Sequence, residues 1–179
     1  MRILLSGLSG TGSTTAAKRI AADLGLDYVY GGQIFRNLAR ERGIALEELA
    51  ESLETNPELE QEIDRRLIEA ARGEDVLVEG RTIGWILPAK VPALRIWLTC
   101  DLPERLRRVE DRDRHPRSAE NLLRREASDN RRYRALYGIE EEDFRPFDLV
   151  LDTTNLSVDE VVRSLEAFIE THAELAQTP

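Results

Sequence analysis

Short apolar segments alternate with longer amphipathic segments along this chain. The apolar segments predict buried strands, and they cover residues 2–6, 27–30, 75–79, 93–99 and 148–151. Apolar residues three or four positions apart predict helices over residues 14–24, 33–42, 46–53, 57–72 and, with an interruption near His115-Pro116, 103–137. A last helix is expected where a capping box precedes an apolar stripe, and these are formed by Ser157, Glu160, Val161, Val162, Leu165 and Ile169.

This alternation of strands and helices predicts an α/β fold built around a largely parallel sheet. The chain has 179 residues, of which 41% are hydrophobic, so it is long enough to bury a core of its own. It contains no internal repeat and no segment with the composition of a linker. We therefore expect a single domain over residues 1–179.

The first predicted strand runs into a glycine-rich loop, residues 7–14, with the sequence GLSGTGST. The spacing of Gly7, Gly12, Ser13 and Thr14 matches the phosphate-binding pattern G-x-x-x-x-G-K-[ST] except at the lysine, whose place Ser13 takes. Glycines followed by the start of a helix present backbone N–H groups that suit a polyphosphate. Thr14 stands where a hydroxyl group commonly holds Mg²⁺. The alternative interpretation is an ordinary glycine-rich connection between a strand and a helix.

Charge and cysteine content narrow the possible partners and compartments. The formal net charge of −9 disfavours sequence-independent binding to nucleic acid. Cys100 is the single cysteine, which excludes an internal disulfide and is compatible with a reducing compartment. The N-terminal apolar run is too short for a signal peptide or a membrane span. We expect a cytoplasmic protein without a nucleic-acid or membrane partner.

Two predicted strands are followed by polar residues that suit phosphate and metal chemistry. Arg36 lies one turn into the helix that follows Gly31-Gly32, so a helix N-terminus and a guanidinium group together can bind a phosphate. Glu79 ends a strand, and its carboxylate can hold Mg²⁺ through water, while Arg81 can bind phosphate oxygens. An exposed helical arginine and a charged turn explain the same residues without any ligand.

Arginines are concentrated in the helical region after the fourth predicted strand. This arginine-rich segment, residues 105–134, contains Arg105, Arg107, Arg108, Arg112, Arg114, Arg117, Arg124, Arg125, Arg131, Arg132 and Arg134. Interleaved acids favour solvated, ion-paired helices for most of these residues. Phosphoryl transfer between two anions nevertheless needs several cations, and Ser13 supplies none. A mobile lid that carries arginines would replace the missing ammonium group.

With these features, the sequence resembles the nucleoside monophosphate kinases, and most specifically the cytidylate kinases of the short archaeal type. The resemblance runs nearly end to end, through GLSGTGSTT, YGGQIFRNLARERG, EIDRRL, VLVEGRTIGWILP, LRIWLTC, RREASDNRRYRALYGIE and FDLVLDTTNLSVDEVV. Its specific part is GGQIFR with VEGR and the spacing Arg125-x-x-x-Asp129-x-x-Arg132. The resemblance implies a P-loop NTPase fold of three layers, with a five-stranded parallel sheet, helices on both faces and a helical lid.

The resemblance also implies transfer of the γ-phosphoryl group of ATP to CMP or dCMP, with Mg²⁺. We expect the protein to be a monomer. ATP would be bound by Gly7, Leu8, Ser9, Gly10, Thr11, Gly12, Ser13, Thr14 and Thr15, and the metal by Thr14 and, through water, Glu79. The nucleoside monophosphate would be bound by Arg36, Arg65, Arg66, Arg81 and Asp129. The catalytic arginines would be Arg112, Arg114, Arg125 and Arg132.

Within the single domain, the resemblance implies a monophosphate-binding region at about 31–72 and a lid at about 105–135, centred on 112–118. Two alternatives remain open. Gln33 replaces an acid that is common in the family, and Thr82 stands where bacterial-type enzymes carry a base-reading aspartate. The chain could therefore act on another small phosphate acceptor. It could also be a nucleotide-binding module that lost catalysis together with the lysine.

Overall fold

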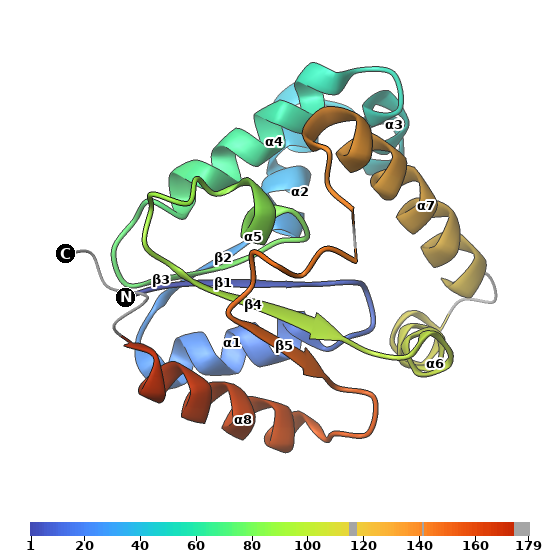
Figure 1. Cartoon of the computed structure of the whole chain (residues 1–179). Coiled ribbons are helices and arrows are strands. Elements are labelled where there is room, and N and C mark those ends of the chain that lie inside the picture. Colours follow the sequence, from blue (N-terminus) through green and yellow to red (C-terminus); the bar gives the residue numbers. More distant parts are fainter. Residues whose placement is uncertain (115–117, 141, 174–179) are drawn as a thin grey trace.

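The computed structural model describes residues 1–114, 118–140 and 142–173, and Figure 1 shows its architecture. Five strands of the described chain pair in parallel in the order β2–β3–β1–β4–β5. Their bounds are β1 (Arg2–Gly7), β2 (Asp27–Tyr30), β3 (Val76–Glu79), β4 (Leu94–Thr99) and β5 (Leu149–Asp152). The carboxyl ends of parallel strands meet at one edge of a sheet, and β1 lies in the middle of that edge. The predicted parallel sheet is confirmed.

Helices cover both faces of the sheet and give the fold three layers (Figure 1). Their bounds are α1 (Ser13–Leu24), α2 (Gly31–Arg42), α3 (Leu46–Leu53), α4 (Pro57–Ala70), α5 (Ile83–Ile86), α6 (Leu102–Asp113), α7 (Ser118–Tyr137) and α8 (Val158–Thr171). α1 and α8 pack on one face, whereas α2, α4 and α5 pack on the other. No helix of the described residues is long and apolar enough to cross a membrane.

The middle of the central strand, residues 3–5, shows why successive positions there are apolar. Ile3 and Leu5 pack toward α1 and α8, whereas Leu4 packs toward the helices of the opposite face, and all three are at most 1% exposed. Successive side chains of a strand point to opposite faces. A strand that is covered on both faces therefore needs apolar residues at successive positions.

The structure corrects two expectations about local structure. α2 begins at Gly31, so Gly31-Gly32 forms its first turn instead of separating a strand from a helix. Residues 83–86 form α5, which the hydrophobic pattern did not predict because a single turn is too short to show a helical period. A Cβ atom on Gly84 would lie 2.2 Å from a carbon of the Phe147 ring, so glycine permits close packing there.

The arginine-rich segment forms α6 and most of α7, which stand at the carboxyl edge of the sheet (Figure 1). α6 follows β4 and packs beside the loop after β1, and α7 then runs toward α3 and α4. The predicted helix interruption near His115-Pro116, and the centre of the expected lid at residues 115–117, lie outside the described residues.

Candidate active site

The glycine-rich loop joins the central strand to α1 in the predicted order of strand, turn and helix. Gly10 and Gly12 both have a φ of 88°, in the left-handed region that favours glycine. α1 begins at Ser13, and the N–H groups of a first helical turn have no partner within the helix. The Thr11 hydroxyl donates to the Leu8 carbonyl oxygen at 2.8 Å and closes the turn. The loop therefore presents the positive end of α1, which attracts phosphate groups.

α6 packs directly on the glycine-rich loop. A Cβ atom on Gly10 would lie 2.7 Å from the carbonyl oxygen of Arg105, so a larger residue would push the helix away. Arg105 donates to the Ser9 carbonyl oxygen at 3.2 Å, and Arg108 donates to the Gly10 carbonyl oxygen at 3.4 Å and to that of Thr153 at 2.8 Å. These two arginines anchor α6 to the loop, which differs from the solvated state expected for most of the arginine-rich segment.

Three hydroxyl groups converge on Glu79 at the end of β3. Glu79 is 5% exposed and pairs in register with Leu5 of the central strand. Thr14 Oγ1 and Ser13 Oγ donate to Oε1 at 2.6 and 2.9 Å, and the Tyr28 hydroxyl donates to Oε2. Burial and the hydrogen bond to Glu79 raise the pKa of Tyr28. The acid predicted to act in metal binding therefore lies beside Thr14, and Tyr28 holds its second oxygen.

Thr14 and Glu79 together fit a Mg²⁺ ion. Hydroxyl and carboxylate oxygens are the ligands that Mg²⁺ prefers, and this ion usually retains several ligands from water and substrate phosphates. The two oxygens already lie 2.6 Å apart at the end of the glycine-rich loop. A metal here would be held by Thr14 and, through water, by Glu79, together with phosphate oxygens.

The spacing of Arg125, Asp129 and Arg132 places all three on one face of α7, because residues three or four positions apart on a helix are neighbours. This face is turned toward the sheet edge. Arg125 Nη2 donates to Ser9 Oγ of the glycine-rich loop at 2.6 Å, across 116 positions of sequence. Arg132 Nη2 donates to Asp129 at 2.5 Å. α7 therefore brings the distant arginines to the edge where the loop lies.

Arg81 and Arg132 belong to a network of buried carboxylates. Both pair with Asp129, Arg132 Nε also donates to Glu60 at 2.8 Å, and Arg81 lies 3.9 Å from Glu126. Both arginine side chains are at most 12% exposed. Burial raises the pKa of Glu60. Burial lowers the pKa of Arg132, but the hydrogen bonds and negative charges of Glu60 and Asp129 raise it by more, so the pKa of Arg132 lies above its usual value.

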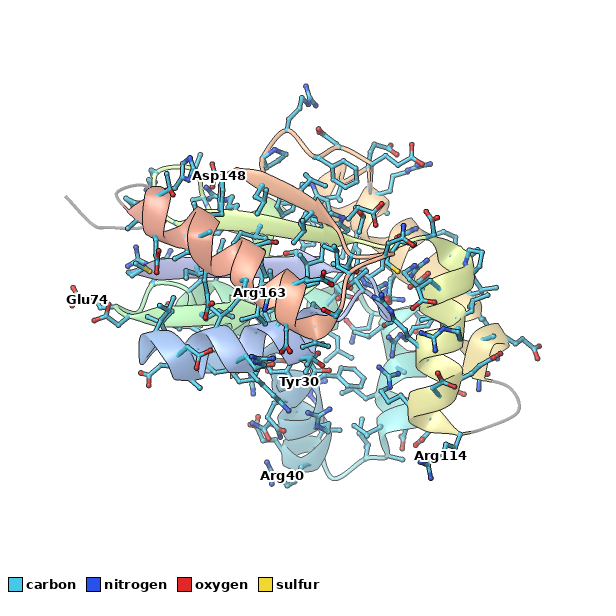
Figure 2. The ribbon with its side chains drawn as sticks, turned by 90° about the horizontal axis from the view of Figure 1, so that it is seen from below. Tyr30, Arg40, Glu74, Arg114, Asp148 and Arg163 are labelled. Atoms are coloured by element: carbon cyan, nitrogen blue, oxygen red, sulfur yellow. The ribbon has the colours of Figure 1, made fainter. Side chains whose placement is uncertain are left out.

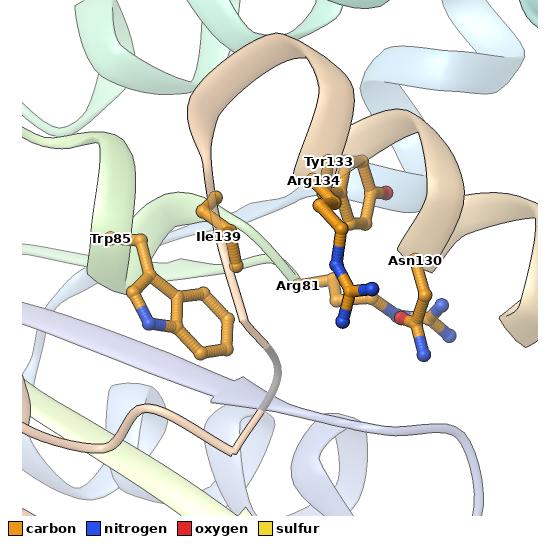
Figure 3. A pocket seen from close by; sticks show the side chains of 6 residues that line it. All are labelled: Arg81, Trp85, Asn130, Tyr133, Arg134 and Ile139. Carbon is orange, nitrogen blue, oxygen red and sulfur yellow. The ribbon is translucent and has the colours of Figure 1, made fainter.

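A hollow of about 50 Å³ lies beside Arg81 (Figure 3). Arg81 and Asn130 approach each other on one side of the hollow, and Trp85 and Ile139 line the other side. Burial raises the pKa of Tyr133, which also lines the hollow, well above its usual value. This space admits a few water molecules, whereas ligand pockets are typically several times larger. The hollow therefore has to widen before it can take a nucleotide.

Three other residues predicted to bind the monophosphate have different surroundings. Arg36 is exposed on α2, and its guanidinium carbon lies 5.3 Å from the centre of the Tyr30 ring. Arg66 donates both of its terminal nitrogens to Glu41 of α2, at 3.0 and 2.8 Å. Arg65 is exposed on the neighbouring face of α4. The structure thus brings Arg81 and Asp129 together but leaves these three arginines outside the network, and their roles stay predictions.

Arg112 and Arg114, which were predicted to be catalytic, lie at the end of α6. Arg112 pairs with Asp113 at 2.6 Å, and its side chain is 62% exposed. Arg114 follows the helix with a φ of 51°, and Figure 2 shows it at the tip of α6 that points away from the sheet. Their surroundings differ from those of Arg125 and Arg132, so a catalytic role for the two residues also stays a prediction.

Comparison with known proteins decides the family. A model of the cytidylate kinase-like family matches residues 2–155. The chain belongs to this family. It is 40% identical to the cytidylate kinase of Methanococcus maripaludis strain C7 over 174 residues, which cover 95% of this chain and 98% of that one. It is 41% identical to the cytidylate kinase of Pyrococcus horikoshii over 172 residues, which cover 94% and 88% of the two chains.

Solved structures of low sequence identity share the fold of this cytidylate kinase-like protein. A shikimate kinase from Bacteroides thetaiotaomicron has a TM-score of 0.62 at 16% identity and covers 95% of this chain and 98% of its own. A gluconokinase from Sinorhizobium meliloti has a TM-score of 0.63 at 17% identity and covers 97% and 93%. Together with the parallel sheet, these likenesses confirm the predicted P-loop NTPase fold.

Sequence reasoning named Asp129 but overlooked two other carboxylates, Glu60 and Glu126, that pair with the arginines of this cytidylate kinase-like protein. Glu60 and Glu126 are 4% and 7% exposed, although charged residues are normally assigned to the surface. One signal for Glu60 was present, because it lies between Leu59 and Ile63 on the stripe that α4 buries. Tyr28 gave no such signal, since an aromatic residue in a short strand normally belongs to the core.

Proposed function

We propose that this protein is a cytidylate kinase that transfers the γ-phosphoryl group of ATP to CMP or dCMP, giving ADP and CDP or dCDP. The observation that carries the proposal is the hydrogen bond from Arg125 to Ser9 at 2.6 Å. It brings a cation from α7 to the loop whose lysine is absent. The match to the cytidylate kinase-like family and the relatives named cytidylate kinase support CMP as the acceptor.

The acceptor in this reaction is a phosphate oxygen that is already anionic, so no general base is required. Catalysis then depends on holding two nucleotides in line and on stabilising negative charge in the transition state. We infer that residues 7–15 bind the phosphates of ATP. We also infer that Arg36 and Arg81 bind the acceptor phosphate, and that Arg125 and Arg132 act on the group in transfer.

The two nucleotides would approach from different parts of the domain. Residues 31–72 would form the monophosphate-binding region, and residues 105–135 would form the lid. The acceptor phosphate would replace carboxylates as a partner of Arg81, which pairs with Asp129 in this structure. Asp129 would then be free to accept a hydrogen bond from a ribose hydroxyl. Closure of the lid would exclude water, which strengthens the interactions between arginines and phosphates.

Thr14 and Glu79 are the residues that would hold Mg²⁺ in this enzyme. When bound, the ion would offset the negative charge of the phosphate groups. Tyr28 donates to Oε2 of Glu79 and thereby fixes the carboxylate, while Oε1 faces the glycine-rich loop. The chain's own contribution at this point would be the Thr14 hydroxyl as a ligand and the Glu79 carboxylate acting through water.

A nucleotide panel tests the proposed function directly. Release of ADP from ATP would be coupled to a spectrophotometric reaction, with CMP, dCMP, UMP, AMP and GMP supplied in turn. We expect kcat/KM for a cytosine nucleotide to exceed that of the other bases by at least about tenfold. Equal rates with all five would refute the specificity. Binding of ATP without turnover of any acceptor would refute the kinase assignment and support a non-catalytic nucleotide-binding module.

Substitution of Ser13 by lysine tests whether arginines have replaced the missing ammonium group. Ser13 Oγ lies 2.9 Å from Glu79 Oε1, so a lysine at this position would have a carboxylate partner within reach. We expect Ser13→Lys to change kcat by less than about tenfold, measured in the ADP-release assay. A rise of a hundredfold, about 2.7 kcal/mol of barrier, would contradict the replacement. Ala22→Lys, which adds the same charge at an exposed position of α1, is the control.

A further inference from the structure

One buried carboxylate of α4 lacks a hydrogen-bond partner on one of its two oxygens. Asp64 is 4% exposed, and its Oδ1 accepts a hydrogen bond from the Thr82 hydroxyl at 2.8 Å. Oδ2 is also buried and has no hydrogen-bond partner among the described residues. A buried acceptor without a donor costs free energy. A donor on a bound molecule would remove that cost.

Asp64 borders an open groove of about 750 Å³, which lies in the size range of ligand pockets. Trp85 and Tyr137 give the groove aromatic walls, and Arg65 lies on its polar side. Burial and a hydrogen bond with the Asp64 carboxyl group raise the pKa of Tyr137, so Tyr137 is a second polar partner of Asp64 beside Thr82. Aromatic walls with a polar edge suit a flat ring that carries hydrogen-bonding groups on its rim.

The groove lies next to the hollow beside Arg81. Trp85 and Ile139 line both spaces, and Figure 3 shows how they stand opposite Arg81. Thr82 follows Arg81 directly in the sequence, so the partner of Asp64 and the candidate phosphate ligand share one turn of the chain. A nucleotide whose phosphate binds Arg81 therefore has a surface along which its base can lie toward Asp64.

We propose that Asp64, held in place by Thr82, accepts a hydrogen bond from the exocyclic amino group of the base and so selects CMP over UMP. The inference rests on the proposed function, because it concerns the acceptor of that reaction. Cytosine carries an amino group where uracil carries a carbonyl oxygen. A carbonyl opposite Oδ2 would leave two acceptors facing each other without a proton, which a buried site rejects strongly.

Binding of the base to Asp64 requires side chains of the groove to move, and it gives Thr82 a positioning role. Oδ2 is covered in this structure, so the side chains that wall the groove must move aside when the base binds. Thr82 acts through Asp64: its hydroxyl donates to Oδ1, which fixes the plane of the carboxylate and leaves Oδ2 as the acceptor for the base. Asp64 is thus the residue that contacts the base, and Thr82 is a positioning residue.

The test compares the binding of CMP and UMP to the full chain by isothermal titration calorimetry, without ATP. Asparagine at position 64 can still accept from Thr82, but it presents an N–H donor in place of Oδ2, which suits the carbonyl of uracil. We expect Asp64→Asn to weaken CMP binding at least about tenfold and to leave UMP binding equal or tighter. Glu58→Gln removes the same charge at an exposed position on the groove and is expected to leave the ratio of the two affinities within about twofold.

The outcomes separate this inference from the proposed function. Equal loss of CMP and UMP binding in Asp64→Asn would indicate a structural role and overturn the inference, and so would an unchanged ratio. If the wild-type chain binds CMP selectively but turns over no acceptor, the kinase assignment fails while the role of Asp64 is still decided by the ratio. If the wild-type chain phosphorylates CMP and the ratio does not change in the variant, only the inference fails.

A second pair of variants tests Thr82 and guards against misfolding of Asp64→Asn. Thr82→Val removes the hydroxyl and keeps the shape of the side chain, so the affinity for CMP relative to UMP should fall at least about fivefold. Thr82→Ser restores the donor and should recover most of that ratio. Loss of selectivity in Thr82→Val without recovery in Thr82→Ser would show that packing, and not orientation of Asp64, is responsible.

Discussion

Replacement of Arg125 by alanine is expected to lower kcat with CMP by about a thousandfold or more, with little change in stability. An arginine that reaches the transferring group contributes about 10³–10⁵ in kcat in related phosphoryl transfers. Arg125 is exposed apart from its contact with Ser9, so its removal leaves no buried charge without a partner. The loss should appear in kcat more than in KM, because the interaction strengthens as charge develops on the transferring group.

The matched control for this experiment is Arg124→Ala. Arg124 is the preceding residue of α7, is exposed, and carries the same charge, but it lies on a different face of the helix. Steady-state kinetics should show kcat within about twofold of wild type for Arg124→Ala, because an isolated surface charge contributes little. Urea unfolding would show whether both variants are folded. If Arg125→Ala keeps more than a tenth of the wild-type kcat, the loop contact is not catalytic.

Replacement of Arg132 by methionine is expected to destabilise the protein by about 3–5 kcal/mol. This is the usual cost of removing one partner of a buried ion pair and leaving the other charge buried. The side chain of Arg132 is 11% exposed and forms ion pairs with both Glu60 and Asp129. Asp129 keeps Arg81 as a partner, whereas Glu60 would be left buried with no cation paired to it among the residues that the structure describes. Urea unfolding at pH 7, followed by circular dichroism, measures the change in the free energy of unfolding.

The destabilisation of Arg132→Met should depend on pH with a definite sign. Burial already raises the pKa of Glu60 above its usual 4.5, and Arg132 opposes that rise. Without Arg132 the pKa of Glu60 rises further, so the folded state binds a proton more tightly than the unfolded state. Stability is lost as the pH rises through that pKa and regained as the pH falls toward 4.5. The deficit relative to wild type should therefore be smaller at pH 5 than at pH 8.

Two further variants isolate the cause of this effect. Glu60→Gln in the Arg132→Met background removes the buried charge and should recover a large part of the lost stability at pH 8. Arg131→Met removes an arginine whose side chain is 68% exposed and which lies 3.5 Å from Glu54, so it should cost less than about 1 kcal/mol. A deficit in Arg132→Met that is independent of pH and unchanged by Glu60→Gln would mean that packing of the arginine stem, not charge, determines the loss.

The glycine-rich loop was recognised in the sequence because its signals are local. The apolar run of β1, the glycines at positions 10 and 12 and the helix start at Ser13 lie within a dozen residues. Each of them fixes its own backbone conformation by sterics or by burial. The same reasoning failed for α5, because a single turn is too short to show a helical period, and Gly84 there packs against the ring of Phe147 from a distant loop.

The partners of the arginines were not predictable in the same way. Sequence spacing indicated that Arg125, Asp129 and Arg132 share one face of a helix, but not what that face contacts. The contact with Ser9 spans 116 positions and the pair with Glu60 spans 72. These contacts depend on how α6 and α7 pack against the glycine-rich loop and α4. A charged residue carries no sequence signal that says it will be buried there.

The sequence by itself determined the parallel α/β fold, the position of the phosphate-binding loop, and the face of α7 that carries the candidate catalytic residues. Tertiary structure alone decided that Arg125 meets the loop, that Glu60 and Asp129 hold Arg132, and that Asp64 keeps one oxygen without a partner. The reason is physical: backbone conformation follows from neighbours along the chain, whereas the partner and exposure of a long charged side chain follow from the packing of elements that are remote in sequence.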